Sequence, residues 1–156
     1  MSFRYDGAES APVNAGSYAV VATIDDPSYT GSATGTLVIE KAAATVTLRE
    51  LAHTYDGNPK AEAATTDPAG LTVTLTYDGS PAAPVDAGSH AVVATVEDPN
   101  HHGTAAGTLV IDKAAATITL AGLAQTYDGS PKPATATTEP AGLAVDITYG
   151  GSPAPP

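Results

Sequence analysis

The chain repeats itself with a period of 72 residues. Residues 3–48 align with residues 75–120 with 30 identities in 46 positions, and residues 45–84 align with residues 117–156 with 26 identities in 40. A repeat of this length exceeds a solenoid unit and matches a small all-β domain in size. We therefore expect each repeat to contain its own hydrophobic core.

The frame of the repeat sets the predicted domain boundaries. The favoured unit starts at the alternating segment AATVTL and ends at LVIDK. In this frame residues 42–113 form a complete repeat domain, residues 1–41 are the C-terminal half of a repeat, and residues 114–156 are the N-terminal half of another. A second frame starts at Phe3 and gives two full units and a ten-residue tail. The sequence leaves both frames open.

Alternation of apolar and polar residues predicts the strands, because successive side chains of a strand point to opposite faces. Leu71–Asp78 alternates in this way, as do Tyr18–Asp25 and its copy from His90 to Val96. The segments TLVIEK and ATVTL supply two further strands. Four of their side chains are expected to face inward: Leu37, Ile39, Val46 and Leu48.

Turn signals separate these strands about every 8 to 12 residues, which is typical of a β-sandwich. The signals are YDG, PAG, DAG and DP, in which Gly supplies positive φ, Pro fixes φ and Asp bonds to the nearby backbone. The Ala runs at 42–44 and 114–116 are too short to form helices. The predicted fold is all-β: tandem small immunoglobulin-like antiparallel β-sandwich repeats of 72 residues, with almost no helix.

Composition limits both the core and the function. Val, Ile, Leu and Phe make up only 27 of 156 residues, so the core has to be thin. A formal net charge of −11 repels nucleic-acid phosphates and anionic lipid surfaces. The absence of Cys excludes disulfides, thiolate nucleophiles and Cys-based zinc sites. The short apolar runs predict no transmembrane helix, and the first ten residues lack the features of a signal peptide.

The order of the motifs resembles a known family. The succession ATVTL, TYDG, PAGL, VTLTYDG, AGSHAVVATVEDPN and GTLVIDKA is similar to the MBG or YDG-type tandem repeats of large bacterial surface adhesins, and more loosely to bacterial immunoglobulin-like domains. The resemblance covers essentially the whole chain. It implies small β-sandwiches strung between a secretion signal and a cell-envelope anchor. Such repeats act as stalk or spacer, and some are implicated in attachment to host glycans.

Histidines raise a metal-site hypothesis, since clustered imidazoles bind zinc or nickel. His90, His101 and His102 lie within a dozen residues, but the first copy has Tyr, Tyr and Thr at these places, and the last copy has Gln in place of His53. We therefore predict no metal site. Ser89 precedes His90, but neighbours on a strand face opposite ways and cannot act as a nucleophile and its base. No catalytic residue is predicted.

Carboxylates recur in the turns, each directly before Gly or Pro or within such a turn. The recurring pairs are Asp6 and Asp78, Asp56 and Asp128, and Asp26 and Asp98. We expect their side chains to cap backbone N–H groups rather than to do acid–base chemistry. EF-hand spacing is absent. We predict no cofactor, with weak calcium binding between acidic loops of neighbouring domains as the open alternative.

Lysines also recur in register, as Lys41 with Lys113 and Lys60 with Lys132. Some surface adhesins lock their domains with an amide bond from Lys to Asn or Asp. Because no Asn recurs here, only an Asp partner is left, and the crosslink is the disfavoured alternative. It would lower the intact mass by about 18 Da per bond.

Tyrosines precede several of the turns: Tyr5, Tyr55, Tyr77, Tyr127 and Tyr149. Two interpretations are open. The favoured one makes them lids of the core with the hydroxyl in water, and the other makes them an exposed ladder for stacking against sugars.

The resemblance therefore implies a non-enzymatic stalk or spacer of a bacterial cell-surface adhesin, extracellular, with signal and anchor outside this segment. The alternative is a weak multivalent module that binds glycan or protein. The predicted partners are neighbouring repeats of the same protein, without nucleic acid or membrane insertion, and the ligand-binding residues are unknown. The half-repeats 1–41 and 114–156 are complementary, so we also expect head-to-tail self-association in a donor-strand manner.

Overall fold

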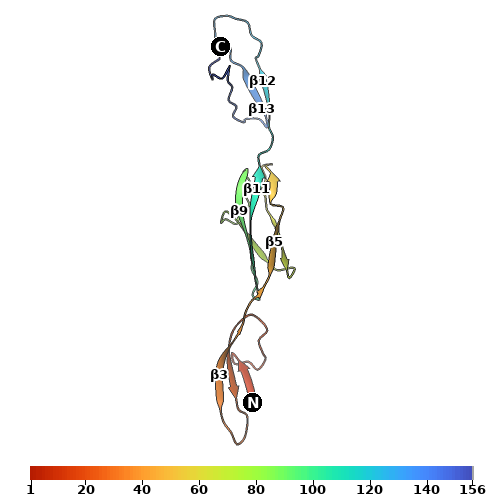
Figure 1. The fold of residues 1–156 in the computed structure, drawn as a ribbon, viewed down its shortest axis with the longest axis vertical. Helices are drawn as coiled ribbons and strands as arrows, with labels where there is room; N and C mark the ends of the chain where they lie inside the picture. The colour runs from red at the N-terminus through yellow and green to blue at the C-terminus, as the bar shows by residue number, and fades with distance from the viewer. Residues whose placement is uncertain (156) are drawn as a thin grey trace. The chain divides into compact units, whose positions relative to one another are not determined.

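The computed structural model describes residues 1–155 and consists of strands and turns (Figure 1). The all-β prediction is confirmed. Because these residues form strands and turns only, none of them belongs to a helix that could span a lipid bilayer. The chain forms two compact units, Met1–Lys113 and a second unit that begins at Ala114. The predicted boundaries at 1–41, 42–113 and 114–156 stay predictions.

The first half-repeat, residues 1–41, is one antiparallel sheet of three strands. These are β1 (Ser2–Tyr5), β2 (Gly16–Thr23) and β3 (Ser32–Ile39), in the order β1-β2-β3. Alternation places Val20 and Ala22 on one face of β2, where they are half-buried. Leu37 lies on the neighbouring strand and is 36% exposed. The sheet therefore has an apolar face without a second layer over it.

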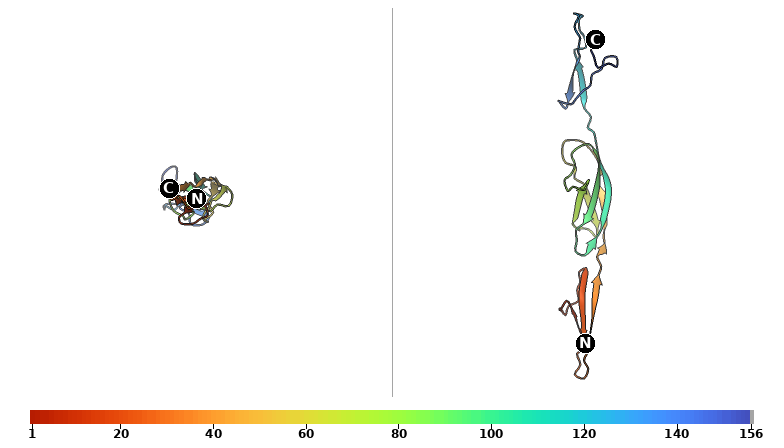
Figure 2. Two further views of the ribbon diagram at one scale, coloured as in Figure 1. Left: turned by 90° about the horizontal axis from the view of Figure 1, so that it is seen from below. Right: turned by 90° about the vertical axis from the view of Figure 1, so that its left-hand side faces the viewer.

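The complete repeat, residues 42–113, contains three sheets, of which two enclose its core. The larger one has the order β6-β11-β9-β8. Its strands are β6 (Ala52–Thr54), β11 (Thr104–Asp112), β9 (Gly88–Val96) and β8 (Val73–Tyr77). The smaller one pairs β5 (Thr45–Arg49) with β7 (Ala63–Asp67). In the right-hand view of Figure 2, β9 (green) and β11 (cyan) run side by side.

The core of the complete repeat lies between these two sheets. Val46 of β5 packs with Ala94 and Val96 of β9 in one cluster, and Leu48 of β5 contacts both clusters. The second cluster is formed by Tyr77, Val92, Leu109 and Ile111. Val92 and Leu109 are fully buried. The alternation seen in the sequence thus selects the buried face correctly.

Two parallel strand pairs were not expected from the sequence. The edge strand β6 runs parallel to β11, and β4 (Ala42–Ala43) runs parallel to β10 (His101–His102). The chain leaves β5 through Glu50, which has a left-handed backbone (φ 62°), and crosses to the edge of the other sheet. The last repeat has Gly122 at the same place, also with positive φ (72°). A crossover of this kind lets β6 keep its direction and pair parallel to β11.

The last half-repeat, from Ala114 onward, contains one antiparallel pair within the described residues. Strand β12 (Thr117–Ala121) pairs with β13 (Thr135–Glu139), as β5 pairs with β7. Ile118 and Leu120 of β12 are 55% and 49% exposed, although they correspond to Val46 and Leu48 in the complete repeat. This pair therefore presents an apolar face that the complete repeat buries.

A buried contact between a carboxyl group and an imidazole lies in the complete repeat beside this core. The Glu62 side chain is fully buried, and its Oε1 lies 3.3 Å from Nε2 of His53. The contact is not a well-formed hydrogen bond, since these buried atoms have no hydrogen-bond partner. Burial raises the pKa of the Glu62 carboxyl above its ordinary value, and the attraction of His53 offsets this only in part. In the last repeat both partners change together, to Ala134 and Gln125.

The packing predicts where the complete repeat is sensitive to truncation. Leu109→Ala should lower the free energy of unfolding by about 2–5 kcal/mol, because the removed atoms leave a cavity in a closed core. The matched control is Val110→Ala on the same strand, because Val110 is 37% exposed on the opposite face. The measurement is urea unfolding followed by the amide NMR signals of β9. Equal losses in the two variants would contradict the assigned core.

Glu62 predicts a pH dependence of stability. A raised pKa in the folded state means that this group contributes stability at low pH, and that the contribution is lost as the pH rises through the raised pKa. Glu62→Gln removes the buried charge, so we expect the variant to be more stable than the parent at about pH 7.5, and the difference to shrink toward about pH 4. Urea unfolding at both pH values checks this.

The control for this measurement is Glu97→Gln, because Glu97 is exposed. It should change the unfolding free energy little at either pH. A Glu62→Gln variant that is less stable than the parent at about pH 7.5 would show that the charged pair is net stabilising.

Candidate functional site

The junction between the first half-repeat and the complete repeat has the most specific contacts outside the cores. The chain from Lys41 to Ala44, here called the linker, pairs with the loop Asp98–Gly103, here called the clamp loop. The Ala42 N–H donates to the Asn100 carbonyl and the Ala44 N–H donates to the His102 carbonyl, each at 2.8 Å. These bonds make the parallel pair of β4 and β10.

Side chains extend this contact beyond the linker. The Asn100 side chain accepts from the Ala15 N–H at 2.8 Å and donates through Nδ2 to Oδ1 of Asn14 at 3.1 Å. The Lys41 ammonium donates to the Asp98 carbonyl at 2.7 Å. Asn100 thus joins the loop that precedes β2 to the clamp loop, across 85 residues of sequence.

Gly103 allows the two backbones to approach closely. A Cβ atom at this position would lie 2.2 Å from the Ala44 carbonyl oxygen, which no side chain can do without displacing the backbone. The linker consists of alanines after Lys41, so no long side chain holds the clamp loop away from them. The junction therefore needs small residues on both sides.

Asp98 holds the shape of the clamp loop. Its Oδ1 accepts from the Asn100 N–H at 2.8 Å and lies 2.8 Å from Nδ1 of His101. The hydrogen bond with His101 is the main reason why the pKa of the Asp98 carboxyl lies below its ordinary value. The loop is therefore built around a carboxylate, and Asn100 projects from it toward the preceding repeat.

The sequences of the clamp loop and of the linker recur elsewhere in the chain, where they do not form the contacts of this junction. The loop Asp26–Gly31 of the first half-repeat matches the clamp loop, and Asp26 caps the Ser28 and Tyr29 N–H groups. Residues Lys113–Ala116 match the linker and form no strand. Sequence reasoning missed the role of Asn100 and Gly103. The recurrence of Gly at 31 and 103 was the available signal.

The histidines do not come together. His90 Nδ1 lies 2.9 Å from Oδ2 of Asp78, and this hydrogen bond is the main reason why the pKa of His90 is raised. His101 bonds Asp98, and His53 faces Glu62. Within residues 1–155, no three His, Asp or Glu side chains gather in a way that could hold a metal ion.

The recurring carboxylates cap backbone N–H groups, as the sequence predicts. Asp6 and Asp78 accept from the strand that follows, at Ala19 and Ala91. The other four accept from residues two positions ahead within their own turns: Asp26, Asp56, Asp98 and Asp128. Weak calcium binding between acidic loops stays a prediction.

The recurring lysines make polar contacts close to their own turns or at the junction. Lys60 Nζ lies 2.6 Å from Oδ2 of Asp56, and Lys132 contacts Asp128 in the same way. These contacts are the main reason why the pKa values of both Asp carboxyls are lowered. Lys41 bonds a carbonyl rather than a carboxylate. The amide crosslink stays a prediction for intact-mass measurement.

The tyrosines divide into two groups. Tyr77 is a core residue, but its hydroxyl accepts from the buried Glu62 N–H at 2.8 Å, so the expectation of a hydroxyl in water was wrong for it. Tyr149 makes the matching bond to Ala134 at 2.7 Å. Tyr55 and Tyr127 are 41% and 91% exposed and are not lids. The position of Tyr77 and Tyr149 in the repeat is thus the packed one, and the position of Tyr55 and Tyr127 is the exposed one.

Comparison with known proteins identifies the repeat. The MBG domain pattern matches residues 1–43, 44–115 and 116–156. No curated protein and no solved structure gives a significant match. MBG repeats are a non-catalytic repeat family and are typical of surface proteins. Since the matched segments span the whole sequence, the chain belongs to the MBG domain family, as a tandem array of its repeats.

Proposed function

We propose that this chain is a structural spacer, a stalk segment of a bacterial cell-surface adhesin that holds a distal binding domain away from the cell. The observation that carries the proposal is the junction between the clamp loop and the linker. The Asn100 side chain and the Lys41 contact join two consecutive repeats directly, and the backbone pairing and the close approach at Gly103 hold the linker between them against the clamp loop. A spacer needs such coupling, because independent repeats on flexible linkers would not sustain reach.

Family membership supports this role. MBG repeats belong to surface proteins, and a spacer has no catalytic step. The acidic composition suits a tandem array, since like charge on near-identical neighbours opposes misassociation. The proposed location is extracellular, on the cell surface.

The junction is tested by Gly103→Ala. The added methyl group collides with the Ala44 carbonyl, so the clamp loop should leave the linker. NMR residual dipolar couplings of residues 16–39 and 63–112 should fit one common alignment tensor in the parent chain and two different tensors in the variant.

The control is Gly31→Ala in the first half-repeat. There the added Cβ would meet only the flexible end of Ile24, at 3.0 Å, and no linker lies beside it. One common tensor should be kept. A single tensor in Gly103→Ala as well, with both segments folded, would remove the support for a coupled spacer.

A second candidate function is weak multivalent glycan binding. Exposed Tyr55 and Tyr127 occupy the same position in two repeats, each next to a Lys–Asp pair. Aromatic faces of this kind stack against sugars. A glycan array read with the parent chain and with Tyr55→Ala plus Tyr127→Ala decides between the two functions. Binding that the double variant loses would favour the glycan-binding module, and absence of binding in the parent would leave the spacer.

A further inference from the structure

Strand β8 forms one outer edge of the four-stranded sheet in the complete repeat. It pairs with β9 on one side, and no strand of residues 1–155 pairs with its other side. An edge of this kind has free backbone groups, on which a further strand can form. We propose that this edge binds an extended peptide segment of a partner protein by strand addition, and that the segment has uncharged strand residues between basic ends.

The hydrogen bonds to β9 show which backbone groups of β8 point outward. The Asp78 N–H donates to the Ala91 carbonyl at 2.8 Å. In an antiparallel pair, residues that bond the neighbouring strand alternate with residues whose N–H and carbonyl point away from it. Counting back from Asp78, Thr76 and Thr74 bond β9. The backbone groups of the other three residues of β8 point outward: Val73, Leu75 and Tyr77.

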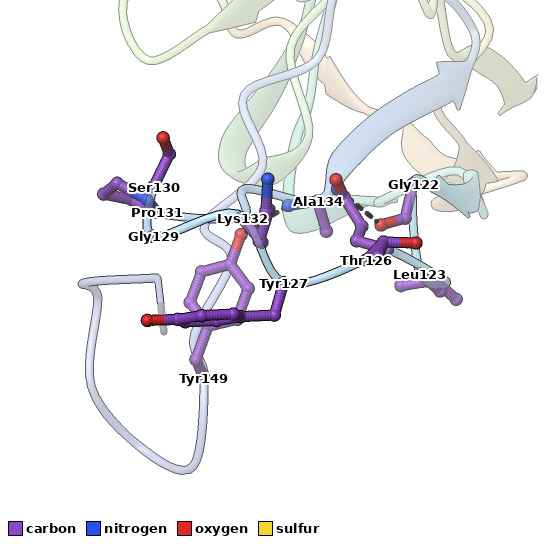
Figure 3. Close-up of a pocket in the computed structure, with 11 residues that line it drawn as sticks. Gly122, Leu123, Thr126, Tyr127, Gly129, Ser130, Pro131, Lys132, Ala134 and Tyr149 are labelled. Atoms are coloured by element: carbon purple, nitrogen blue, oxygen red, sulfur yellow. Dashed lines mark hydrogen bonds between the residues drawn. The ribbon is translucent and has the colours of Figure 1, made fainter.

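Tyr77 closes one end of this edge. Its N–H donates to the Ser80 carbonyl at 2.6 Å, and its carbonyl accepts from the Ser80 N–H at 2.8 Å. Its hydroxyl accepts from the Glu62 N–H, which ties β8 to the segment before β7. The last repeat has the same hydroxyl contact, between Tyr149 and Ala134 (Figure 3). The edge strand is therefore fixed in place before any partner binds.

The free backbone groups lie at Val73 and Leu75. Neither residue has a hydrogen-bond partner for its outward N–H or carbonyl in the described part of the chain. The two residues are two positions apart on one strand, so their outward groups repeat at the spacing of a strand ladder. They offer two N–H donors and two carbonyl acceptors, which is what an added strand needs.

The complete repeat lacks the charges that the other copies have on this strand. Proteins commonly protect an open edge with charged side chains or Pro. Arg4 stands at the place of Thr76 in the first copy, and Asp146 stands at the place of Thr74 in the last. In the complete repeat the run Leu71–Tyr77 contains no charged residue and no Pro. The complete repeat is therefore the copy in which this edge is left open to pairing.

The charges around the edge favour a partner with basic ends. Residues 71–97, which contain β8 and β9, have three carboxylates, Asp78, Asp86 and Glu97, and no Lys or Arg. Asp78 follows β8 directly, and its side chain is 57% exposed although it contacts His90. Glu97 follows β9 at the other end of β8. A second copy of this edge would bring like charges together, whereas ammonium groups at both ends of a peptide are attracted.

A synthetic peptide tests the proposal on the full chain. The probe is Lys-Thr-Val-Thr-Val-Thr-Lys, acetylated and amidated, and NMR follows amide hydrogen exchange. Without peptide, the N–H groups of Val73 and Leu75 should exchange at least about tenfold faster than those of Thr74 and Thr76. Peptide at millimolar concentration should slow exchange at Val73 and Leu75 by about tenfold and leave the two threonines unchanged.

Two altered peptides test the two parts of the proposal separately. The same peptide with N-methyl groups on its Thr and Val residues cannot donate to the edge and should not slow the exchange. The peptide with Glu at both ends should bind at least about tenfold more weakly at low salt. Equal slowing by the N-methyl peptide would overturn strand addition, and equal binding of the Glu peptide would overturn the basic partner.

A variant of the edge gives the matching test on the protein. Thr76→Arg introduces the residue of the first copy, places a cation beside the edge and should weaken binding of the Lys peptide by about tenfold. The matched control is Thr108→Arg, because Thr108 is exposed on β11, two strands away from β8. It should bind like the parent.

Two results would contradict the proposal as a whole. One is a parent chain in which the Lys peptide leaves exchange at Val73 and Leu75 unchanged, and the other is equal binding of this peptide to Thr76→Arg and to the parent. The proposal goes beyond the spacer function and does not rest on it. The dipolar-coupling test of the junction is therefore independent of these results.

Discussion

The contact of Leu48 and Leu51 with strand β11 decides whether a repeat has a core. Val, Ile, Leu and Phe make up only 27 of the 156 residues and most other apolar residues are Ala, so neither layer can shield its own inner face. Where both layers are present, Val92 and Leu109 are fully buried. Where one layer is missing, the matching face is open, as at Leu37 and Leu120. The burial of the same residue types therefore depends on the presence of the second layer and not on the strand alone.

The junction is held together by different interactions from those that stabilise the core. Its contacts are backbone hydrogen bonds and one amide side chain, and its closest surfaces consist of Ala and Gly. Such a contact buries little apolar area, but it fixes the register between linker and clamp loop, because N–H and carbonyl groups have to meet in order. The alanine run that is too short for a helix serves as a strand at β4, where the clamp loop pairs with it, and forms no strand at 114–116. Pairing with the following repeat, and not the sequence of the linker, gives it strand structure.

The sequence predicts the strands and their buried faces well, because a period of two is a local signal. It also predicts that the turn carboxylates cap backbone N–H groups, since the partners lie nearby or on the next strand. It does not reveal the parallel edge strand β6, because the three residues Ala52–Thr54 are too few to show alternation. The sequence does not reveal the contacts of the clamp loop for a related reason. The contact between Ala15 and Asn100 spans 85 residues and has no periodic pattern. The buried Tyr77 hydroxyl is missed because its partner is a backbone N–H.

Differences between the copies show which positions tolerate change. His90 replaces Tyr18, yet the His90 Nε2 meets the Asp86 carbonyl as the Tyr18 hydroxyl meets that of Asn14, so the contact is kept with different chemistry. At the clamp loop the difference between the copies falls on the side chain that makes the contact with the preceding repeat. Ser28 stands where Asn100 stands, and its shorter side chain with a single hydroxyl cannot both accept and donate over the same span. The apolar positions that are buried in the complete repeat, by contrast, are identical in the other copies or exchange Val for Ile. Successive repeats therefore share one core design, whereas the residue that projects from the clamp loop differs between them, Ser28 in one copy and Asn100 in the other.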